Sequence, residues 1–431
     1  GYAALLSVAC LGVPVLMASQ EWDDHDRSQK TLARDIAKDY LNSCAHNAIL
    51  FTGGDNDTYP LWYAQEVENV RPDIRIIITT LLGTDWFIDD LRRKINESDP
   101  VPFSWSPDKY QGDKRDYVYY FNPGNIPEDK YFNIEDVMQF IGSDNQQDQV
   151  QMDNGQWINY LPTKHLYIPV DKQTVLQNGT VPPEDSSYIV PEVKFTINNN
   201  VLMKNDLAEL NIIAANHWKR PIYFTSPYLS LGLNDYLEID GLTYRLVPYR
   251  KSDSAGLFGN LNVNIPFMYD NLMHKFAFGG AQIPGTYFDE TNRRELQLIR
   301  SAFTQLAIAL ALHQKKDSAL QVLHYMDKNI LPENFPYGYT SPGNIHDLYS
   351  TQTAYAYYLA GDTTRANQIV QDVMRDCEQQ LNYYASLGSK LSGDLQQDEQ
   401  SATYIIQQLQ EMKHQFATSQ MPAAKDSAVG K

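Results

Sequence analysis

The chain has 431 residues, of which 43% are hydrophobic and 20% are charged. This length and composition exclude a disordered or low-complexity protein and predict two or three folded domains. The net charge of −18 disfavours nucleic acids and anionic membrane surfaces as partners. The cysteines, Cys10, Cys44 and Cys377, lie far apart in the sequence, so neither a CxxC motif nor a disulfide framework is predicted.

The first segment of the chain is apolar, because residues 2–19 contain no charged side chain. As a helix this segment would span roughly 27 Å, close to the hydrocarbon thickness of a bilayer. No basic residue precedes it, as a signal peptide would require. We interpret residues 1–19 as the end of a transmembrane helix whose upstream protein is missing. The acidic flank at 21–26 fits the non-cytoplasmic side of the membrane. A buried N-terminal helix and a signal peptide are the alternatives.

Residues 28–95 alternate between helix and strand patterns. The apolar runs Ala48–Thr52 and Ile74–Leu82 have the length and composition of buried strands. Helices are expected over 28–41, over 61–69, and from Thr84 or Asp85 to about residue 95. The order strand–helix–strand–helix predicts a Rossmann-like parallel sheet.

The next hundred residues differ in composition. Residues 98–200 are rich in Pro, Asp, Asn and Gly, and we interpret them as a long irregular insertion that its aromatic residues keep ordered. A helix over Asp206–Trp218, a strand over Ile222–Thr225 and a hairpin over 236–247 follow. Together these elements predict an α/β domain over residues 20–290.

The remaining chain has a helical pattern with an internal repeat. Six residues recur at one offset of 47, namely Ala307, Ala309, Leu312, Ala319, Gln321 and Val322 against Ala354, Ala356, Leu359, Ala366, Gln368 and Ile369. Each copy reads as two helices joined by a short turn, with small residues where the helices would cross. The pattern predicts an all-α, tetratricopeptide-like repeat domain over 291–415. Residues 416–431 are expected to be a flexible tail.

The loop Gly53–Thr58 is the strongest candidate site. It follows the carboxyl end of a predicted strand, where open α/β sheets bind ligands. Asp55 and Asp57, with Asn56 between them, have the spacing of Asp-x-Asp motifs that chelate a divalent cation in sugar-nucleotide transferases. Alternatively, the two glycines turn the chain and Asp57 or Thr58 caps the next helix. The residue types leave both interpretations open.

Other candidate side chains follow the later strands and helices. Asp85 is either a helix cap or a second carboxylate facing the first loop, and Trp86 could stack on a sugar ring. His217 is the candidate acid–base residue, and Arg220 could bind an anion, although both could be structural at the end of their helix. The sequence contains no dinucleotide, P-loop, nucleophile-elbow or zinc motif.

Several segments together resemble one known family. They are Trp22–Arg27, Asn47–Tyr63, Trp218–Phe224, Gly241–Pro248 and Tyr269–Met273. The chain resembles the carboxy-terminal soluble half of a multi-spanning membrane protein family of the Bacteroidota, which is grouped with protein O-mannosyltransferase-like glycosyltransferases that use lipid-linked sugars. The resemblance covers nearly all of residues 1–415.

The resemblance implies a periplasmic, membrane-anchored region of a glycosyltransferase. In that class the catalytic acidic residue and the lipid-linked donor lie in loops between membrane helices, so no catalytic residue transfers to this sequence. We therefore expect an accessory region that binds a protein acceptor, with the upstream membrane domain as its partner and the helical repeats as an acceptor surface. No cofactor or metal is expected here.

Two other functions fit the same residues. A free-standing, metal-dependent sugar-processing enzyme would use Asp55 and Asp57, with Asp85, around a divalent cation. A scaffold would bind a protein partner on the helical repeats and leave the α/β domain inert.

Overall fold

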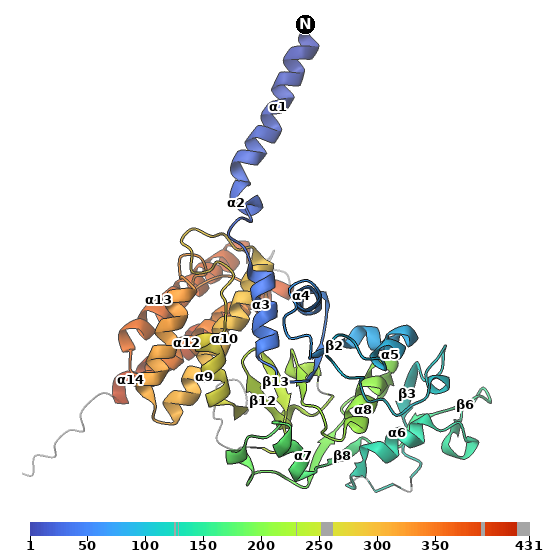
Figure 1. Ribbon diagram of the computed structural model, residues 1–431. Helices are drawn as coiled ribbons and strands as arrows, with labels where there is room; N and C mark the ends of the chain where they lie inside the picture. The colour runs from blue at the N-terminus through green and yellow to red at the C-terminus, as the bar shows by residue number, and fades with distance from the viewer. Residues whose placement is uncertain (125, 128, 230, 251–261, 389–392, 420–431) are drawn as a thin grey trace, which may run out of the picture. The chain divides into compact units, whose positions relative to one another are not determined.

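The computed structural model, shown in Figure 1, describes residues 1–124, 126–127, 129–229, 231–250, 262–388 and 393–419. The chain divides into two compact units. Unit 1 consists of Gly1–Ala33 and Phe278–Lys431, and unit 2 of Arg34–Ala277. The expected α/β domain, 20–290, spans unit 2 and short segments of unit 1 at both ends.

Unit 2 is built on a six-stranded sheet in the order β14-β12-β13-β11-β1-β2. The strands are β1 (Ile49–Thr52), β2 (Arg75–Ile78), β11 (Ile222–Phe224), β12 (Leu237–Asp240), β13 (Thr243–Leu246) and β14 (Asn262–Val263). Strands β11, β1 and β2 are parallel, and α4 (Asp55–Glu66) connects β1 to β2. The hairpin β12–β13 joins β11 antiparallel. Strands β12 and β14 are also parallel to each other. The sheet is therefore mixed, and the prediction of a parallel sheet is correct for β11, β1 and β2 but not for the antiparallel hairpin.

Further helices of unit 2 lie before, between and after these strands. They are α3 (Leu32–Asn42, which begins in unit 1), α5 (Asp85–Leu91), α8 (Lys204–Asn216) and α9 (Ile265–His274). The strands β1 and β2 are buried at every position. Their continuous apolar composition follows from this, since a strand covered on both faces needs no polar alternation.

The insertion at 98–200 is more regular than predicted. It contains the helices α6 (Ile134–Gly142) and α7 (Lys172–Gln177). Its strands are β3 (Tyr117–Tyr120), β4 (Phe132–Asn133), β5 (Val150–Gln151), β6 (Trp157–Ile158), β7 (Tyr160–Leu161), β8 (His165–Pro169) and β9 (Glu192–Thr196). With β10 (Val201–Met203) they form sheets β10-β3-β7, β4-β8-β9 and β5-β6. The insertion is thus made of short elements of two to nine residues joined by loops, which its composition alone did not reveal.

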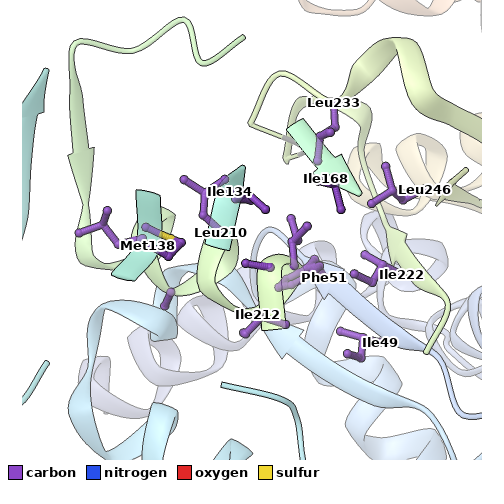
Figure 2. Close-up of a cluster of buried hydrophobic side chains, with 14 of the residues drawn as sticks. Ile49, Phe51, Ile134, Met138, Ile168, Leu210, Ile212, Ile222, Leu233 and Leu246 are labelled. Carbon is purple, nitrogen blue, oxygen red and sulfur yellow. The ribbon is translucent and has the colours of Figure 1, made fainter. Parts of the chain in front are cut away.

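One hydrophobic core joins the insertion to the main sheet (Figure 2). Helix α8 is central to this core, since ten of its thirteen residues are buried and it has no solvent-facing side. Its side chains Leu210 and Ile212 lie among those of β1, β11, α6 and β8, including Ile49, Phe51, Ile222, Ile134 and Ile168. The insertion is therefore a part of the same folded unit as the sheet.

Buried charges hold the hairpin β12–β13 together. The Arg245 guanidinium lies 2.5 Å from the Glu238 carboxylate and 3.1 Å from that of Asp240. The Tyr249 hydroxyl donates to Glu238, and the Tyr223 hydroxyl donates to Asp240 at 3.1 Å. All three charged residues are buried, and burial raises the pKa of Asp240 to about 7. Arg245 attracts both carboxylates across the two strands, and this attraction offsets part of the free-energy cost of burying the charges.

Unit 1 contains two antiparallel helical hairpins and a final helix. The first hairpin is α10 (Glu290–Leu312) with α11 (Lys316–Asn329), and the second is α12 (Ile345–Ala360) with α13 (Thr363–Leu387). Helix α14 (Gly393–Ser419) packs on α13 and α12. It includes residues 416–419 of the expected tail, and the rest of that tail, 420–431, lies outside the described residues.

Four of the six residue pairs at the predicted offset of 47 have the same burial in the two hairpins. Ala307 and Ala354 are both buried in the first helix of their hairpins, and Ala319 and Ala366 are both fully buried in the second. The pair Val322 and Ile369 is also fully buried, whereas Gln321 and Gln368 are both exposed. The other two pairs differ, since Ala309 is partly buried and Ala356 fully buried, and Leu312 is exposed and Leu359 partly buried.

The loop between the hairpins is packed around a buried arginine. The Arg300 guanidinium lies 4.1 Å from the centre of the Phe335 ring and 4.2 Å from that of Tyr337. It also donates to the main-chain oxygens of Phe335 and Pro336. Gly338 is required here, because a Cβ at this position would lie 2.3 Å from the Asp372 carbonyl oxygen on α13.

The apolar start of the chain forms α1 (Tyr2–Gln20), followed by the short α2 (Trp22–His25). No residue of α1 is buried. Within the described ranges it is the one helix long and apolar enough to cross a membrane. Its length and composition are those of a membrane anchor or a signal sequence.

Replacing Ala366 with leucine should destabilise unit 1. The added side chain has no room at a fully buried position in the second helix of a repeat, so we expect a loss of about 1–3 kcal/mol in the free energy of unfolding. Chemical denaturation followed by far-UV circular dichroism measures the change. The control Gln368→Ala, at an exposed position two residues away, should stay within about 0.5 kcal/mol of the wild type. Equal stability of Ala366→Leu and the wild type would contradict the repeat packing.

Candidate functional site

The loop at the carboxyl end of β1 is closed by the Asp57 side chain. One carboxylate oxygen, Oδ2, accepts hydrogen bonds from the Gly53 amide at 2.9 Å and the Thr225 hydroxyl at 2.6 Å. The other oxygen, Oδ1, accepts from the Gly54 amide at 2.8 Å. Asp57 thus satisfies two amides ahead of α4 and joins this loop to the residue after β11.

Helix α4 begins at Asp55, earlier than the sequence predicts, because Asp57 reaches back to cap the helix from its third position. The Thr58 hydroxyl donates to the Gly54 carbonyl oxygen at 2.6 Å and lies 2.7 Å from the Thr52 hydroxyl. These contacts correspond to the structural interpretation of the Gly-Gly-Asp-Asn-Asp-Thr loop.

Asp55 and Asn56 differ from Asp57 because both are exposed at the first turn of α4. Their position favours negative charge, since the amino end of a helix carries a partial positive charge. In the part of the chain that the structure describes, no three His, Cys, Asp or Glu side chains are grouped as metal ligands.

Asp85 links the start of α5 to the insertion and to α8. One carboxylate oxygen accepts a hydrogen bond from the Gly112 amide at 2.7 Å, and the other lies 3.1 Å from the Lys204 ammonium group. Lys204 is buried and also contacts Asp116 at 2.6 Å. Asp85 thus contacts Gly112 and Lys204 rather than the Asp57 loop. The neighbouring Trp86 is exposed, as a ring that stacks on a ligand would need to be.

Arg220 is buried at the opposite edge of the sheet, where the parallel strands begin. Its guanidinium donates to the main-chain oxygens of Asn47, Ala48 and Asp99 and to the Ser98 hydroxyl, at 2.8 to 3.1 Å. Burial, with Arg75 nearby, lowers the pKa of Arg220 to about 10. These four acceptors occupy the donors that an anion would need. Arg220 therefore acts as a structural clamp.

His217 lies at the mouth of a small pocket at the carboxyl end of α8. Its Nε2 atom is 3.0 Å from the Glu135 carboxylate at the start of α6, and both side chains are partly exposed. The pocket has a volume of about 270 Å³ and an apolar wall that includes Ile168 and Trp218. The backbone is strained here, since both His217 and Trp218 have positive φ angles, 46° and 59°. His217 thus keeps a carboxylate partner and an adjacent cavity, as an acid–base or binding residue requires.

The structure thus separates the predicted site residues. Asp57 is joined to Thr225. The side chains of Asp55, Asn56 and Trp86 are exposed. Asp85, His217 and Arg220 each have different partners. His217 and Arg220, three residues apart in the sequence, have no partner in common. No single constellation of these residues forms.

An exposed aromatic surface was not predicted from the sequence. It lies on the sheet β10-β3-β7 of the insertion, and we call it the aromatic face. Tyr117, Tyr119, Phe121 and Met203 are 53%, 44%, 45% and 50% exposed. Met203 pairs directly with Tyr117 across the strands, and the Tyr117 and Tyr119 rings are 5.4 Å apart. The alternation of Tyr117-Val118-Tyr119-Tyr120-Phe121, with Val118 buried, is the sequence signal that would have found it.

A pair of carboxyl groups in unit 1 was also not predicted. Asp347 on α12 is buried, and its carboxyl accepts hydrogen bonds from the Tyr339 amide and weakly from Gln380. Burial, together with the neighbouring Asp376, raises the pKa of Asp347 to about 8. Asp376 accepts hydrogen bonds from Gln380 at 2.7 Å and from the Thr340 hydroxyl at 3.1 Å. These contacts tie α12, α13 and the loop before α12 together.

Comparison with known proteins places unit 2 in a family. A family model described as TMEM260-associated domain 2 matches residues 33–265, which is more than half of the chain. The chain belongs to this family. The match coincides with nearly all of unit 2 and contains the Asp57 loop, the His217 pocket and the aromatic face. Comparison with curated proteins and with solved structures gives no match.

Replacing Asp57 with alanine should destabilise unit 2 by about 2 kcal/mol, because the Gly53 and Gly54 amides and the Thr225 hydroxyl lose a charged acceptor. Asp55→Ala is the matched control, and only its interaction with the helix dipole is lost, at less than about 1 kcal/mol. Urea denaturation of the two variants measures the difference. A larger loss for Asp55→Ala than for Asp57→Ala would contradict the assignment of Asp57 as the structural residue.

Proposed function

We propose that this chain is the membrane-anchored, periplasmic region of a protein O-mannosyltransferase-like glycosyltransferase, and that it binds the protein acceptor. The transfer chemistry, with its lipid-linked sugar donor, is assigned to a membrane domain upstream. The observation that carries the proposal is family membership, since residues 33–265 match a domain named for its association with TMEM260, a protein O-mannosyltransferase-like family.

The exposed helix α1 supports membrane anchoring. A 19-residue apolar helix with no buried residue would leave a large apolar surface exposed to water, which is unfavourable in free energy. Insertion into a bilayer would remove this surface from water. The acidic flank after α1, without Lys or Arg up to residue 26, supports a non-cytoplasmic location of the folded units.

Acceptor binding is assigned to the aromatic face of unit 2. A surface with three aromatic rings and a methionine, each about half exposed, is rare on a protein without partners and is typical of a binding surface. Tyr and Phe supply contact area at low entropic cost, and Met adapts to different partners. A glycosyltransferase that modifies several acceptors needs these properties.

We also propose that the hairpins α10–α11 and α12–α13 are tetratricopeptide-like and form a second acceptor contact. Support comes from the repeated burial of Ala307 with Ala354 and of Ala319 with Ala366 at the helix pairs. The period of 47 exceeds the usual period of about 34 residues because the loop 332–343 lies between the hairpins.

No transfer step is assigned to the carboxylates of this chain. Asp57 and Asp85 accept hydrogen bonds from main-chain amides, and Asp85 also pairs with Lys204. A carboxylate that holds the fold in this way is poorly placed to act as a nucleophile or to bind a reacting sugar.

The proposal predicts that loss of the aromatic face weakens acceptor use by the whole membrane protein. We expect the double variant Tyr117→Ser/Tyr119→Ser to raise the KM for a protein acceptor about tenfold and to leave kcat nearly unchanged, because binding but not chemistry is lost. The measurement is transfer of labelled mannose from a lipid-linked donor to a purified envelope protein, in membranes containing the full-length enzyme.

The matched control is Tyr59→Ser/Tyr228→Ser, which removes two exposed tyrosines that follow β1 and β11. It should leave both constants unchanged. A tenfold effect in the control and none in the aromatic-face variant would move acceptor binding to the carboxyl edge of the sheet. Transfer by the present chain alone, without the membrane domain, would overturn the proposal.

A further inference from the structure

An open groove crosses unit 1 between the loop before α12, the second half of α13 and the beginning of α14. Its volume is about 560 Å³. Its lining includes Ser341, Gln379, Gln380, Tyr383, Tyr384 and Asp398. None of the described lining residues is Lys or Arg.

The floor of this groove is held in place by hydrogen bonds. Gln380 donates through its amide to Asp376 at 2.7 Å and accepts from the Tyr384 hydroxyl at 3.3 Å. Asp376 is in turn fixed by the Thr340 hydroxyl. Because both carboxamide atoms of Gln380 are engaged, its plane is oriented before a ligand binds.

The walls of the groove present polar and aromatic groups to solvent. Tyr383 is 57% exposed, and its ring leans on that of Tyr384 at a centroid distance of 5.8 Å. Gln379 is exposed beside it on α13. On the opposite wall, Asp398 accepts a hydrogen bond from the Gly343 amide through Oδ1 at 3.1 Å, which fixes the carboxylate and leaves Oδ2 as a further acceptor.

We propose that this groove binds a neutral sugar ring. Exposed Tyr383 offers a flat face for the C–H side of a sugar, while the fixed Asp398 carboxylate and the exposed Gln379 carboxamide match the donors and acceptors of adjacent hydroxyl groups. The Asp398 carboxylate in the lining disfavours anionic ligands such as phosphates and carboxylates. The volume is sufficient for a monosaccharide or disaccharide.

This inference goes beyond the proposed function and does not depend on it. The aromatic face proposed above lies on unit 2, whereas this groove lies within unit 1, and its sugar ligand differs from the protein acceptor proposed for the helical hairpins. A sugar site in the helical unit would let the chain recognise a glycan that a protein already carries.

Saturation-transfer difference NMR on the complete chain tests the proposal. The chain is held in dodecylphosphocholine micelles, because many other detergents carry sugar headgroups that would compete. The probes are methyl α-D-mannopyranoside and methyl α-D-glucopyranoside. We expect a saturable signal for at least one of them in the millimolar range, and a dissociation constant raised about tenfold by Tyr383→Ala.

Two further variants make the test specific. Tyr404→Ala removes a tyrosine that is 54% exposed on α14 and does not line the groove, so the affinity should be unchanged. Gln379→Ala removes an exposed hydrogen-bonding side chain from the groove and should weaken binding as Tyr383→Ala does. Circular dichroism spectra of all three variants should match the wild type.

Two results would overturn the proposal. One is the lack of a saturable signal from either sugar with the folded wild-type chain. The other is sugar binding that Tyr383→Ala and Gln379→Ala leave unchanged, since the site would then lie elsewhere. Failure here would leave the acceptor surface on unit 2 unaffected, because that surface is tested by the KM of the full-length enzyme.

Discussion

Unit 2 depends on charged side chains that satisfy main-chain groups at both edges of its parallel strands. At the carboxyl edge, the Asp57 carboxylate accepts hydrogen bonds from two amides and from Thr225. At the amino edge, the guanidinium groups of Arg71, Arg75 and Arg220 donate to carbonyl oxygens of the loops at 41–48 and 91–99. Burying a main-chain N–H or C=O group without a partner destabilises the fold by more free energy than a typical hydrogen bond contributes. By providing these partners, the charged side chains allow short strands to end inside a covered sheet.

The need to pair these main-chain groups explains why charged residues in the most distinctive sequence segments have structural roles. Asp57 and Arg220 lie in the segments with the most distinctive sequences, yet both point into the protein and bind its backbone. The groups available to ligands are found elsewhere. They are the exposed aromatic face of the insertion, the His217–Glu135 pair beside its pocket, and the polar groove of unit 1. The region that matches the TMEM260-associated domain 2 family contains the aromatic face and the His217–Glu135 pair, whereas the groove of unit 1 lies outside it.

The sequence predicted those elements whose signal is local. The buried runs at β1 and β2, the hairpin β12–β13 and the repeat at an offset of 47 were all readable from apolar patterns and turn residues. The insertion at 98–200 was not, because its short strands pair with distant segments, as β3 pairs with β10. The partners of Asp85 were equally unpredictable, since Lys204 is more than one hundred residues away and meets it only after the insertion has folded. Side-chain roles at the sheet edges required the tertiary structure.

We propose that Asp57 and Asp85, at the carboxyl edge of the sheet, support the fold and hold no catalytic metal. Calorimetric titration of Mn²⁺, Ca²⁺ and Mg²⁺ into the complete chain, beside the folded Asp55→Ala variant, tests it most directly. We expect only heats of dilution for both proteins, because the carboxylates of Asp57 and Asp85 already accept hydrogen bonds from within the protein. Saturable binding of any of these ions to the wild type that disappears in Asp55→Ala would contradict it and would support a metal-dependent enzyme.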